Sequence, residues 1–408
     1  MRTILKLAWR NIWRNKKRSI ITIISVFIAV FLALIIRSMQ LGMYDNVIKN
    51  VAGNYTGYLQ IHNKGYWEDR NLENSITLND TLIKKINTTE GVEDIVPRLQ
   101  TFSLASYGNT SKGVLINGID IEKENKIRSL GERLSKGKAF VSAANEVIVG
   151  KGLAKYFSLK PNDTIYLIGQ GYHGMAAAGK FTVAGIIDLK NLELNNLVIF
   201  MPIKTLRNYL SSPDIVTNLI ILKSEKTDVD KLRIQLLKNL PENQFEVMTW
   251  KKMLPELHQA IVADNAGGLY MVFILYLIIT FGIFSTILMM TQERIFEFGI
   301  MTAIGMKKKV IIKILWVETL LLSLIGVVLG SIVAYPILYY FHKNPLPLPS
   351  DKADMMEKFG FLPEIPFSIS TDIFITHGLI IFGIAVFVAL YPTLKILRLN
   401  TLKAMHKK

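Results

Sequence analysis

The chain has 408 residues, no cysteine, and a formal net charge of +16. Without cysteine the chain forms no disulfides, so its cysteine content does not indicate whether its compartment is oxidising or reducing. The basic residues lie beside hydrophobic runs rather than on an aromatic-rich soluble face, which argues against nucleic acid as a partner. Half of the residues are hydrophobic, and the composition favours a membrane protein with a large soluble part.

Residues 1–18 predict a cytoplasmic amphipathic helix. Trp9 and Trp13 are four positions apart and share one helix face, with arginines and lysines close by. Tryptophan beside basic residues is typical of a helix that lies along the membrane–water boundary. A plain extension of the first membrane span is the alternative interpretation. The apolar residues of the other face are Ile4, Leu7, Ala8 and Ile12.

Four hydrophobic runs predict transmembrane helices. Each has roughly the 20 residues that cross a hydrocarbon core of about 30 Å. A single run of this kind could be the core helix of a soluble protein, but four runs with basic flanks argue against that alternative. The predicted spans are 19–42, 267–291, 310–342 and 372–395.

Charged residues near the ends of these spans predict an orientation. The start of the chain, the connection between the second and third spans, and the end of the chain hold 17 basic residues and 2 acidic ones. With four spans, all three segments lie on the same side of the membrane. The positive-inside rule then places both termini of this multi-pass protein in the cytoplasm. The tail is 396–408, and 343–371 becomes an extracytoplasmic loop.

The long segment 43–266 is predicted to be an extracytoplasmic domain. Strand-like runs and helix-like runs both occur in it, which indicates a mixed α/β (α+β) fold. An early α/β pattern returns after a middle part that contains mostly strands. We therefore expect two lobes, one formed by about 66–130 and 197–262 and the other by about 131–196.

No part of the chain has the pattern of a catalytic or metal site. Gly174 to Lys180 matches G-x-x-x-x-G-K, but Phe181 follows where a phosphate-binding loop needs Ser or Thr, and the next residues predict a strand rather than a helix. The six histidines are scattered without metal-binding spacing. We expect no catalytic residue, no metal and no cofactor in this chain, so ATP hydrolysis would belong to a partner.

Residues 292–309 are predicted to form a short cytoplasmic helix between the second and third spans. Apolar residues recur about every three positions and form one stripe on such a helix, consisting of Ile295, Phe298, Met301 and Ile304. This stripe would offer a surface to a cytoplasmic protein. An ordinary amphipathic connector is the alternative.

Three residues of the third span are candidates for intramembrane roles. Glu318 is costly in lipid and should face a protein partner or a cavity, as a hinge, a relay or an interhelical hydrogen bond. Its closeness to the inner membrane boundary is the alternative explanation. Gly326 and Gly330 form a G-x-x-x-G motif, which lets helices pack closely in membranes.

These features together resemble the FtsX/MacB-like permeases of ABC transporters, which have four spans and a large external domain between the first two. The segment QERIFEFGIMTAIG (292–305) closely resembles their coupling-helix motif, QER-x-x-E-I-G-x-x-x-A-x-G, with Phe298 where Ile or Val is usual. Glu318 and the G-x-x-x-G motif match the E…G-x-x-x-G pattern that follows the coupling-helix motif in this family, and 397–405 is similar to the family's tail. The segments AWRNIWRN (8–15) and YTGYLQIH (55–62) look most like the lipoprotein-releasing, LolC/LolE-like branch.

The resemblance implies a permease of the bacterial inner membrane that works by mechanotransmission. A cytoplasmic ABC ATPase dimer would bind ATP and Mg and move the coupling helix, and a second permease chain, identical or related, would complete the membrane part. The residues expected to contact the ATPase are Glu293, Arg294, Glu297, Phe298, Gly299, Met301 and Gly305.

The resemblance also implies a cargo. In the lipoprotein-releasing case a lipoprotein would enter between the first two spans from the outer leaflet and pass to a periplasmic carrier. The large apolar or amphipathic residues at this level suit that path, although ordinary lipid contact is the alternative; they are Met39, Met43, Tyr44, Tyr270 and Phe273. The other functions left open are MacB-like efflux of peptides or antibiotics through an adaptor, FtsX-like regulation of a cell-wall hydrolase, and a membrane-anchored binding protein outside the ABC class.

Overall fold

The computed structural model describes residues 2–127, 130–140, 145–189, 191–224, 227–241, 243–349 and 364–398. The chain divides into two compact units. The first, which we call the helical unit, consists of Met1–Asp45, Ile261–Leu346 and Ile365–Lys408. The second, which we call the sheet unit, consists of Asn46–Ala260 and Pro347–Glu364.

The helical unit is built around helices long enough to cross a membrane, as the sequence predicts. Among the described residues four stretches qualify by length and composition, Lys16–Gly53, Pro255–Glu293, Lys308–Lys343 and Thr371–Leu397. A separate N-terminal helix precedes them. The helices are α1 (Arg2–Arg14), α2 (Lys16–Ile48), α10 (Pro255–Glu293), α11 (Ile295–Ala303), α12 (Lys308–Lys343), α14 (Thr371–Val388) and α15 (Leu390–Leu397).

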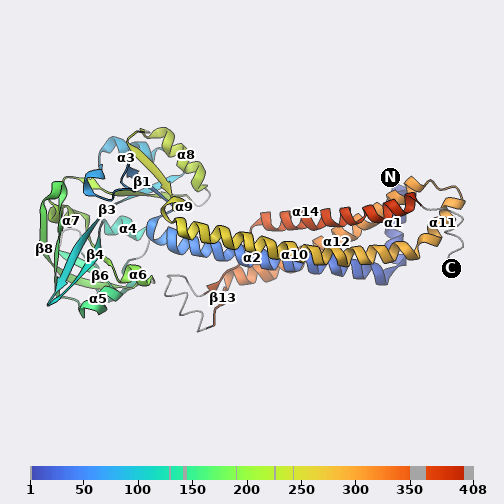
Figure 1. Cartoon of the computed structure of the whole chain (residues 1–408), viewed down its shortest axis with the longest axis horizontal. Helices are drawn as coiled ribbons and strands as arrows, with labels where there is room; N and C mark the ends of the chain where they lie inside the picture. Colours follow the sequence, from blue (N-terminus) through green and yellow to red (C-terminus); the bar gives the residue numbers. More distant parts are fainter. Residues whose placement is uncertain are drawn as a thin grey trace. The chain divides into compact units, whose positions relative to one another are not determined.

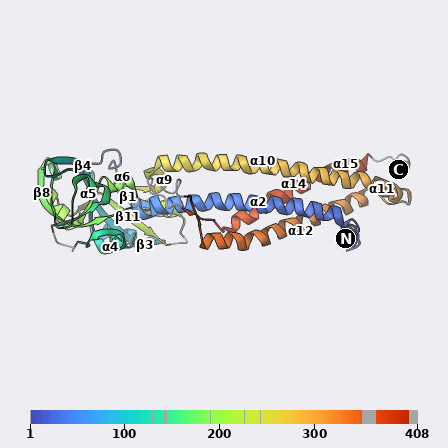
Figure 2. The same ribbon diagram turned by 90° about the horizontal axis from the view of Figure 1, so that it is seen from below.

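Several of these helices extend beyond the expected spans. Helix α2 continues past residue 42, and α10 begins before residue 267. A helix satisfies its own backbone hydrogen bonds, so it need not end where the hydrocarbon ends. Helices α1 and α11 and the end of α15 lie at one end of the bundle, which we call the α11 end (Figures 1 and 2).

Close packing of α12 on α2 depends on the two glycines of the G-x-x-x-G motif. A Cβ atom at Gly326 would lie 2.6 Å from Cβ of Val26, and one at Gly330 would lie 2.9 Å from Cβ of Val30. Such distances are too short for real carbon atoms, so a larger residue would push the helices apart. Lipid is as apolar as the helices, and this contact therefore depends on fit rather than on the hydrophobic effect.

The sheet unit is a mixed α/β domain. Its described residues form one ten-stranded sheet in the order β12-β1-β11-β3-β4-β9-β6-β8-β5, with β7 paired to β3 and β8. Most pairs are antiparallel, whereas β4 with β9 and β6 with β8 are parallel. The strands are β1 (Leu59–Asn63), β3 (Val92–Tyr107), β4 (Thr110–Ile119), β5 (Leu134–Gly137), β6 (Glu146–Gly150), β7 (Thr164–Gln170), β8 (Ala176–Ile187), β9 (Val198–Pro202), β11 (Asn218–Lys223) and β12 (Phe245–Thr249).

Short elements complete this unit. A second, two-stranded sheet pairs β10 with β2. The helices are the π-helix η1 (Lys49–Thr56), α3 (Asp80–Asn87), α4 (Ile121–Asn125), α5 (Lys151–Phe157), α6 (Leu192–Asn195), α7 (Ile203–Leu210), α8 (Val229–Asn239) and α9 (Trp250–Met253), with three 3-10 turns, η2 (Leu72–Asn74), η3 (Gly131–Arg133) and η4 (Tyr172–Gly174). The remaining strands are β2 (Ile76–Thr77), β10 (Ile215–Val216), β13 (Leu346–Pro347) and β14 (Glu364–Ile365).

Strand β3 joins the two expected lobes. Its first half pairs with β11, and its second half pairs with β4 and β7. One core gathers around β1, β11 and β12, and a second gathers around β4, β6, β7 and β8. The sixteen residues of β3 contribute to both cores, so the sheet continues across the lobe boundaries expected near residues 130 and 197.

Buried polar side chains stabilise this sheet. Nε and Nη2 of Arg98 donate to the two carboxylate oxygens of Glu124 at 2.9 and 2.6 Å, and Nη1 donates to the carbonyl of Tyr55 at 2.6 Å. His62 is fully buried and stacks on Tyr66. Burial, together with the nearby charge of Arg70, lowers the pKa of His62 to about 4, so His62 is neutral at pH 7 and serves the core rather than the surface.

The segment that matches G-x-x-x-x-G-K belongs to this sheet as well. Ala176 to Lys180 form the start of β8 and pair with β7. A phosphate-binding loop would require a helix N-terminus at this place. The strand therefore agrees with the rejection of nucleotide binding here.

Candidate coupling site at one end of the helical unit

Residues at both ends of α11 determine where this short helix begins and ends. The backbone of Arg294 leaves the helical region at the end of α10, and α11 runs from Ile295 to Ala303. Gly305 then has φ +98°, a left-handed conformation that favours glycine. The N–H of Gly305 donates to Thr302 at 3.1 Å and the N–H of Met306 donates to Met301 at 2.9 Å, which is the Schellman arrangement. Gly305 is therefore needed to end α11.

The predicted apolar stripe of α11 is split: Phe298 and Met301 face the chain itself, whereas Ile304 is exposed. Phe298 is only 2% exposed and packs with Ile311 and Leu315 of α12 and Ile396 of α15. Gly299 is buried beside it. We expected Phe298 and Gly299 to sit in the groove of a partner, and their burial leaves no surface for that contact. Periodicity locates a stripe but does not tell which neighbour covers it.

A different face of α11 is free to meet a partner. Ile304 is 81% exposed, and Phe296 and Ile300 are exposed on the same side at intervals of four residues. Met301 is partly buried against the Phe298 cluster. The described contacts therefore assign the inward role to Phe298 and leave Phe296, Ile300 and Ile304 as the outward apolar surface.

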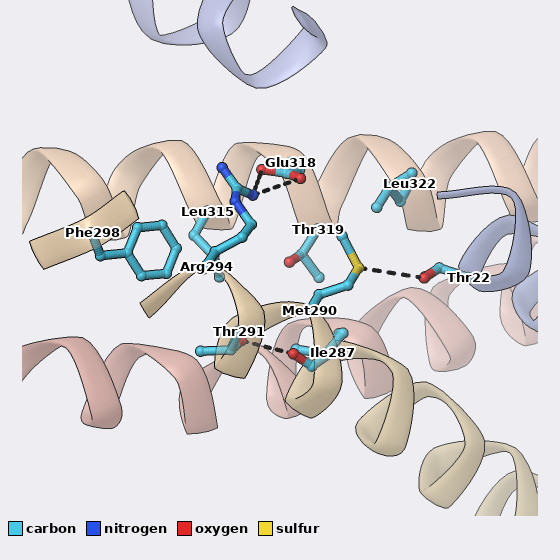
Figure 3. A pocket seen from close by; sticks show the side chains of 10 residues that line it. All are labelled: Thr22, Ile287, Met290, Thr291, Arg294, Phe298, Leu315, Glu318, Thr319 and Leu322. Atoms are coloured by element: carbon cyan, nitrogen blue, oxygen red, sulfur yellow. Dashed lines mark hydrogen bonds and ion pairs between the residues drawn. The ribbon is translucent and has the colours of Figure 1, made fainter. Parts of the chain in front are cut away.

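A buried ion pair connects the start of α11 to the middle of α12. Nη1 of Arg294 lies 3.0 Å from Oε1 and 2.8 Å from Oε2 of Glu318 (Figure 3). Arg294 is 5% exposed and Glu318 is 3% exposed. The guanidinium also lies over the ring of Phe298, 5.3 Å from its centroid. Glu318 thus has the protein partner that a carboxylate in a span requires, and Arg294 turns inward rather than toward an ATPase.

Five apolar side chains and three threonines surround this ion pair. The cavity around it is lined by side chains of α2, α10, α11 and α12 (Figure 3). The hydroxyl of Thr22 on α2 contacts the sulfur of Met290 at 3.9 Å, so α2 closes one side. A buried pair of this kind is costly to break, because the remaining charge would be left without a partner; the cost is about 3–5 kcal/mol.

Helix α1 also contacts α11 through charges. Nη2 of Arg14 lies 2.5 Å from Oε2 of Glu297. Next to this contact, Arg18 at the start of α2 pairs with Glu293 at the end of α10. Ala8 and Ile12 are buried, and α1 packs on α12. The sequence predicted α1 as a membrane-surface helix, and the complementary charges of 14–18 and 293–297 were the signal that could have placed it beside α11.

The residues expected on the cargo path lie at the other end of the helical unit. Met39, Met43 and Tyr44 on α2 are half-buried, whereas Tyr270 and Phe273 on α10 are strongly exposed. At this level Nη1 of Arg37 donates to Oδ1 of Asn265 at 2.7 Å. The structure therefore gives α10 an open apolar face and bridges α2 to α10 beside it.

A latch of polar side chains forms this bridge. The hydroxyl of Tyr44 donates to Oδ2 of Asp264 at 2.5 Å, and Nε2 of Gln40 donates to the carbonyl of Asp264 at 3.0 Å. Gln40 lies directly on Gly268, where a Cβ atom would be 2.0 Å from Nε2. We call these residues, together with Arg37 and Asn265, the α2–α10 latch.

The helices, the inserted mixed domain and the short α11 define a multi-pass membrane permease. The family model described as MacB-like periplasmic core domain matches residues 19–238, and the model described as FtsX-like permease C-terminal matches residues 269–401. The chain therefore belongs to the FtsX-like permeases with a MacB-like periplasmic core domain. This confirms the family that the motifs resemble.

Several curated proteins are similar to this chain. It is 26% identical over 179 residues to the ABC transporter permease YtrF of Bacillus subtilis, covering 43% of this chain and 39% of that protein. It is 22% identical to the lipoprotein-releasing transmembrane protein LolE of Haemophilus influenzae, covering 62% and 63%. It is 22% identical to the macrolide export ATP-binding/permease protein MacB of Campylobacter jejuni, covering 75% and 48%. The chain thus spans less than two thirds of the length of each.

Two solved structures of external domains are similar to part of this chain. The extracellular domain of YknZ from Gram-positive bacteria matches at 15% identity and a TM-score of 0.34, covering 47% of this chain and 99% of that one. The periplasmic region of MacB from Actinobacillus actinomycetemcomitans matches at 15% identity and a TM-score of 0.37, covering 52% and 97%.

Proposed function

We propose that this chain is the transmembrane permease subunit of an ATP-driven ABC transporter that works by mechanotransmission. The observation that carries the proposal is the buried ion pair between Arg294 and Glu318. It joins the first turn of α11 to α12 inside an apolar environment, where the pair resists separation. A push on the exposed face of α11 would then move α12 with it, and not only the short helix.

The partner that pushes would be a cytoplasmic ABC ATPase dimer, which binds ATP and Mg. Phe296, Ile300 and Ile304 would fill its groove, since an exposed apolar strip of this kind suits a protein interface. A second permease chain, identical or related, would face this one. The similarity to YtrF, an ABC transporter permease, supports a separate ATPase subunit, whereas MacB is named as an ATP-binding and permease protein in one chain.

The cargo that we propose is a lipoprotein extracted from the outer leaflet and passed to a periplasmic carrier. Tyr270 is 72% exposed and Phe273 is exposed beside it, so α10 offers an apolar wall at the level of the latch. Such a wall suits acyl chains, because each buried CH₂ contributes about 0.8 kcal/mol. The similarity to LolE supports the same cargo.

Efflux is the second candidate, because the similarity to the macrolide exporter MacB covers 75% of this chain. An efflux permease would work with an adaptor and would leave lipoproteins in place. A signalling permease that regulates a cell-wall hydrolase would move neither lipoprotein nor drug.

Photo-crosslinking tests the cargo. The chain would be reconstituted with its ATPase in proteoliposomes that contain a lipoprotein, with a photoreactive residue at Met43 or Tyr270. Leu379 on α14, which is similarly exposed, provides the matched control. We expect lipoprotein adducts at Met43 and Tyr270 that disappear when ATP is added, and none at Leu379. Adducts with bulk phospholipid alone, unchanged by ATP, would favour efflux or signalling.

A further inference from the structure

A cleft lined by basic residues lies where α1 ends and α2 begins. Its volume is about 530 Å³, and we call it the basic cleft. Five cations and two carboxylates line it with Trp13 and Asn15, but Arg294 is buried and already paired with Glu318, so four cations remain for a ligand. The charged lining residues are Arg14, Lys16, Lys17, Arg18, Glu293, Arg294 and Glu297. The excess of positive charge indicates a ligand with negative charge.

The positive charges of this cleft are only partly neutralised. Arg14 and Arg18 pair with Glu297 and Glu293, but these side chains are about one third to one half exposed. Exposed pairs contribute about 0–1 kcal/mol, so a stronger anion can replace the carboxylate. Within the part of the chain that the structure describes, no carboxylate lies within 4.0 Å of Lys16 or Lys17.

Apolar surface borders the cleft on both sides. Trp13 lines the cleft, is exposed, and contacts Trp9 edge to face at 5.9 Å. On α2, exposed isoleucines begin immediately after Arg18, at Ile20, Ile21 and Ile24. A tryptophan pair beside basic residues marks the membrane–water boundary. The cations of the cleft thus lie next to exposed apolar side chains, at the depth where phospholipid head groups lie.

We infer that the basic cleft binds the phosphate of an anionic phospholipid. Arginine binds phosphate oxygens in a planar fork and lysine binds them as a point charge, while basic pockets between membrane helices take lipid head groups. The acyl chains would lie along Ile20 and Ile24. The phosphate would compete with Glu297 for Arg14, so the lipid would act on α11 directly. This inference uses the membrane position of α2 and is independent of the cargo.

Quenching of Trp13 fluorescence tests the site. The full chain would be placed in nanodiscs with brominated phosphatidylglycerol or brominated phosphatidylcholine. The emission of Trp13 would be obtained by subtracting the emission of a Trp13→Phe variant from that of the native chain. We expect stronger quenching by phosphatidylglycerol at equal mole fraction. The variant Lys16→Gln/Lys17→Gln should lower the preference about fivefold for each lysine. Lys6→Gln, an exposed lysine of α1 outside the lining, is the matched control and should leave the preference unchanged.

Three results would overturn the inference. Equal quenching by the two lipids, or an equal loss of preference in Lys6→Gln, would mean that the cleft does not select an anionic head group. Complete competition by millimolar soluble glycerol phosphate would assign the site to a free phosphate instead of a lipid. Retention of phosphatidylglycerol by the purified chain, measured by native mass spectrometry and reduced in Lys16→Gln/Lys17→Gln, would support the lipid by a second route.

Discussion

The two ends of the helical unit are connected in different ways. At the α11 end, the buried pair of Arg294 and Glu318 joins α11 to α12 in mostly apolar surroundings. At the other end, the α2–α10 latch uses exposed hydrogen bonds around Asp264. A buried charge pair costs several kcal/mol to break, whereas an exposed hydrogen bond contributes about 1 kcal/mol. The molecule is therefore stiff at the α11 end and easily opened at the latch.

The strongest test of the stiff end removes one charge from the buried pair. Arg294→Met leaves Glu318 buried without a partner, and we expect a loss of about 3–5 kcal/mol in the free energy of unfolding. The double variant Arg294→Met/Glu318→Leu removes both charges and should recover most of that stability. Unfolding in mixed detergent, followed by circular dichroism, measures both values. Equal stability of the single and double variants would contradict the ion pair.

The two faces of α11 provide a second test. Phe298→Asp places a carboxylate in a buried cluster and should lower stability by more than about 3 kcal/mol, with loss of folded chain. Ile304→Asp changes an exposed residue, so we expect normal folding but at least a tenfold loss of ATP-driven transport. Both are measured by thermal unfolding and by transport in proteoliposomes. Full transport by Ile304→Asp would place the ATPase contact elsewhere.

The smallest expected effect concerns the latch. In Gly268→Ala the new Cβ would displace Gln40, which removes its bond to Asp264 at a cost of about 1 kcal/mol. Gly267→Ala is the matched control, because a Cβ at Gly267 meets open space. We expect a Cys substituted at Met43 to react with a maleimide several times faster in Gly268→Ala than in Gly267→Ala. Equal rates would mean that Gln40 does not hold the latch closed.

The sequence predicts the spans well, because hydropathy is a local signal, and it predicts a short helix between the second and third spans. Gly305 was expected to contact an ATPase, and its role in ending α11 was not predicted. Glu318 is correctly expected to need a protein partner. The partner itself is not predictable from periodicity, since Arg294 lies 24 residues away along the chain and was expected to contact an ATPase. An arginine at the end of one span and a carboxylate about three turns inside the next are a signal that could have suggested the pair.

Two features were not predicted, namely which face of α11 is buried and which strands pair with β3, and both depend on tertiary packing. Phe298 belongs to a stripe that suits either a partner or the chain's own α12, and only the tertiary packing decides between them. Likewise, β3 pairs with three different strands, and strand order depends on contacts between distant parts of the chain.

A distance measurement tests the central claim, that α11 and α12 move together. Spin labels would be attached to cysteines at Ala303 on α11 and Ile332 on α12, both exposed, in a chain without native cysteine. Double electron–electron resonance spectroscopy would measure the distance between the labels in the complex with the ATPase, once with ATP and once without it. We predict one unchanged distance in the native chain and a changed or broadened one in Arg294→Met/Glu318→Leu. A distance that shifts with ATP in the native chain would contradict the account.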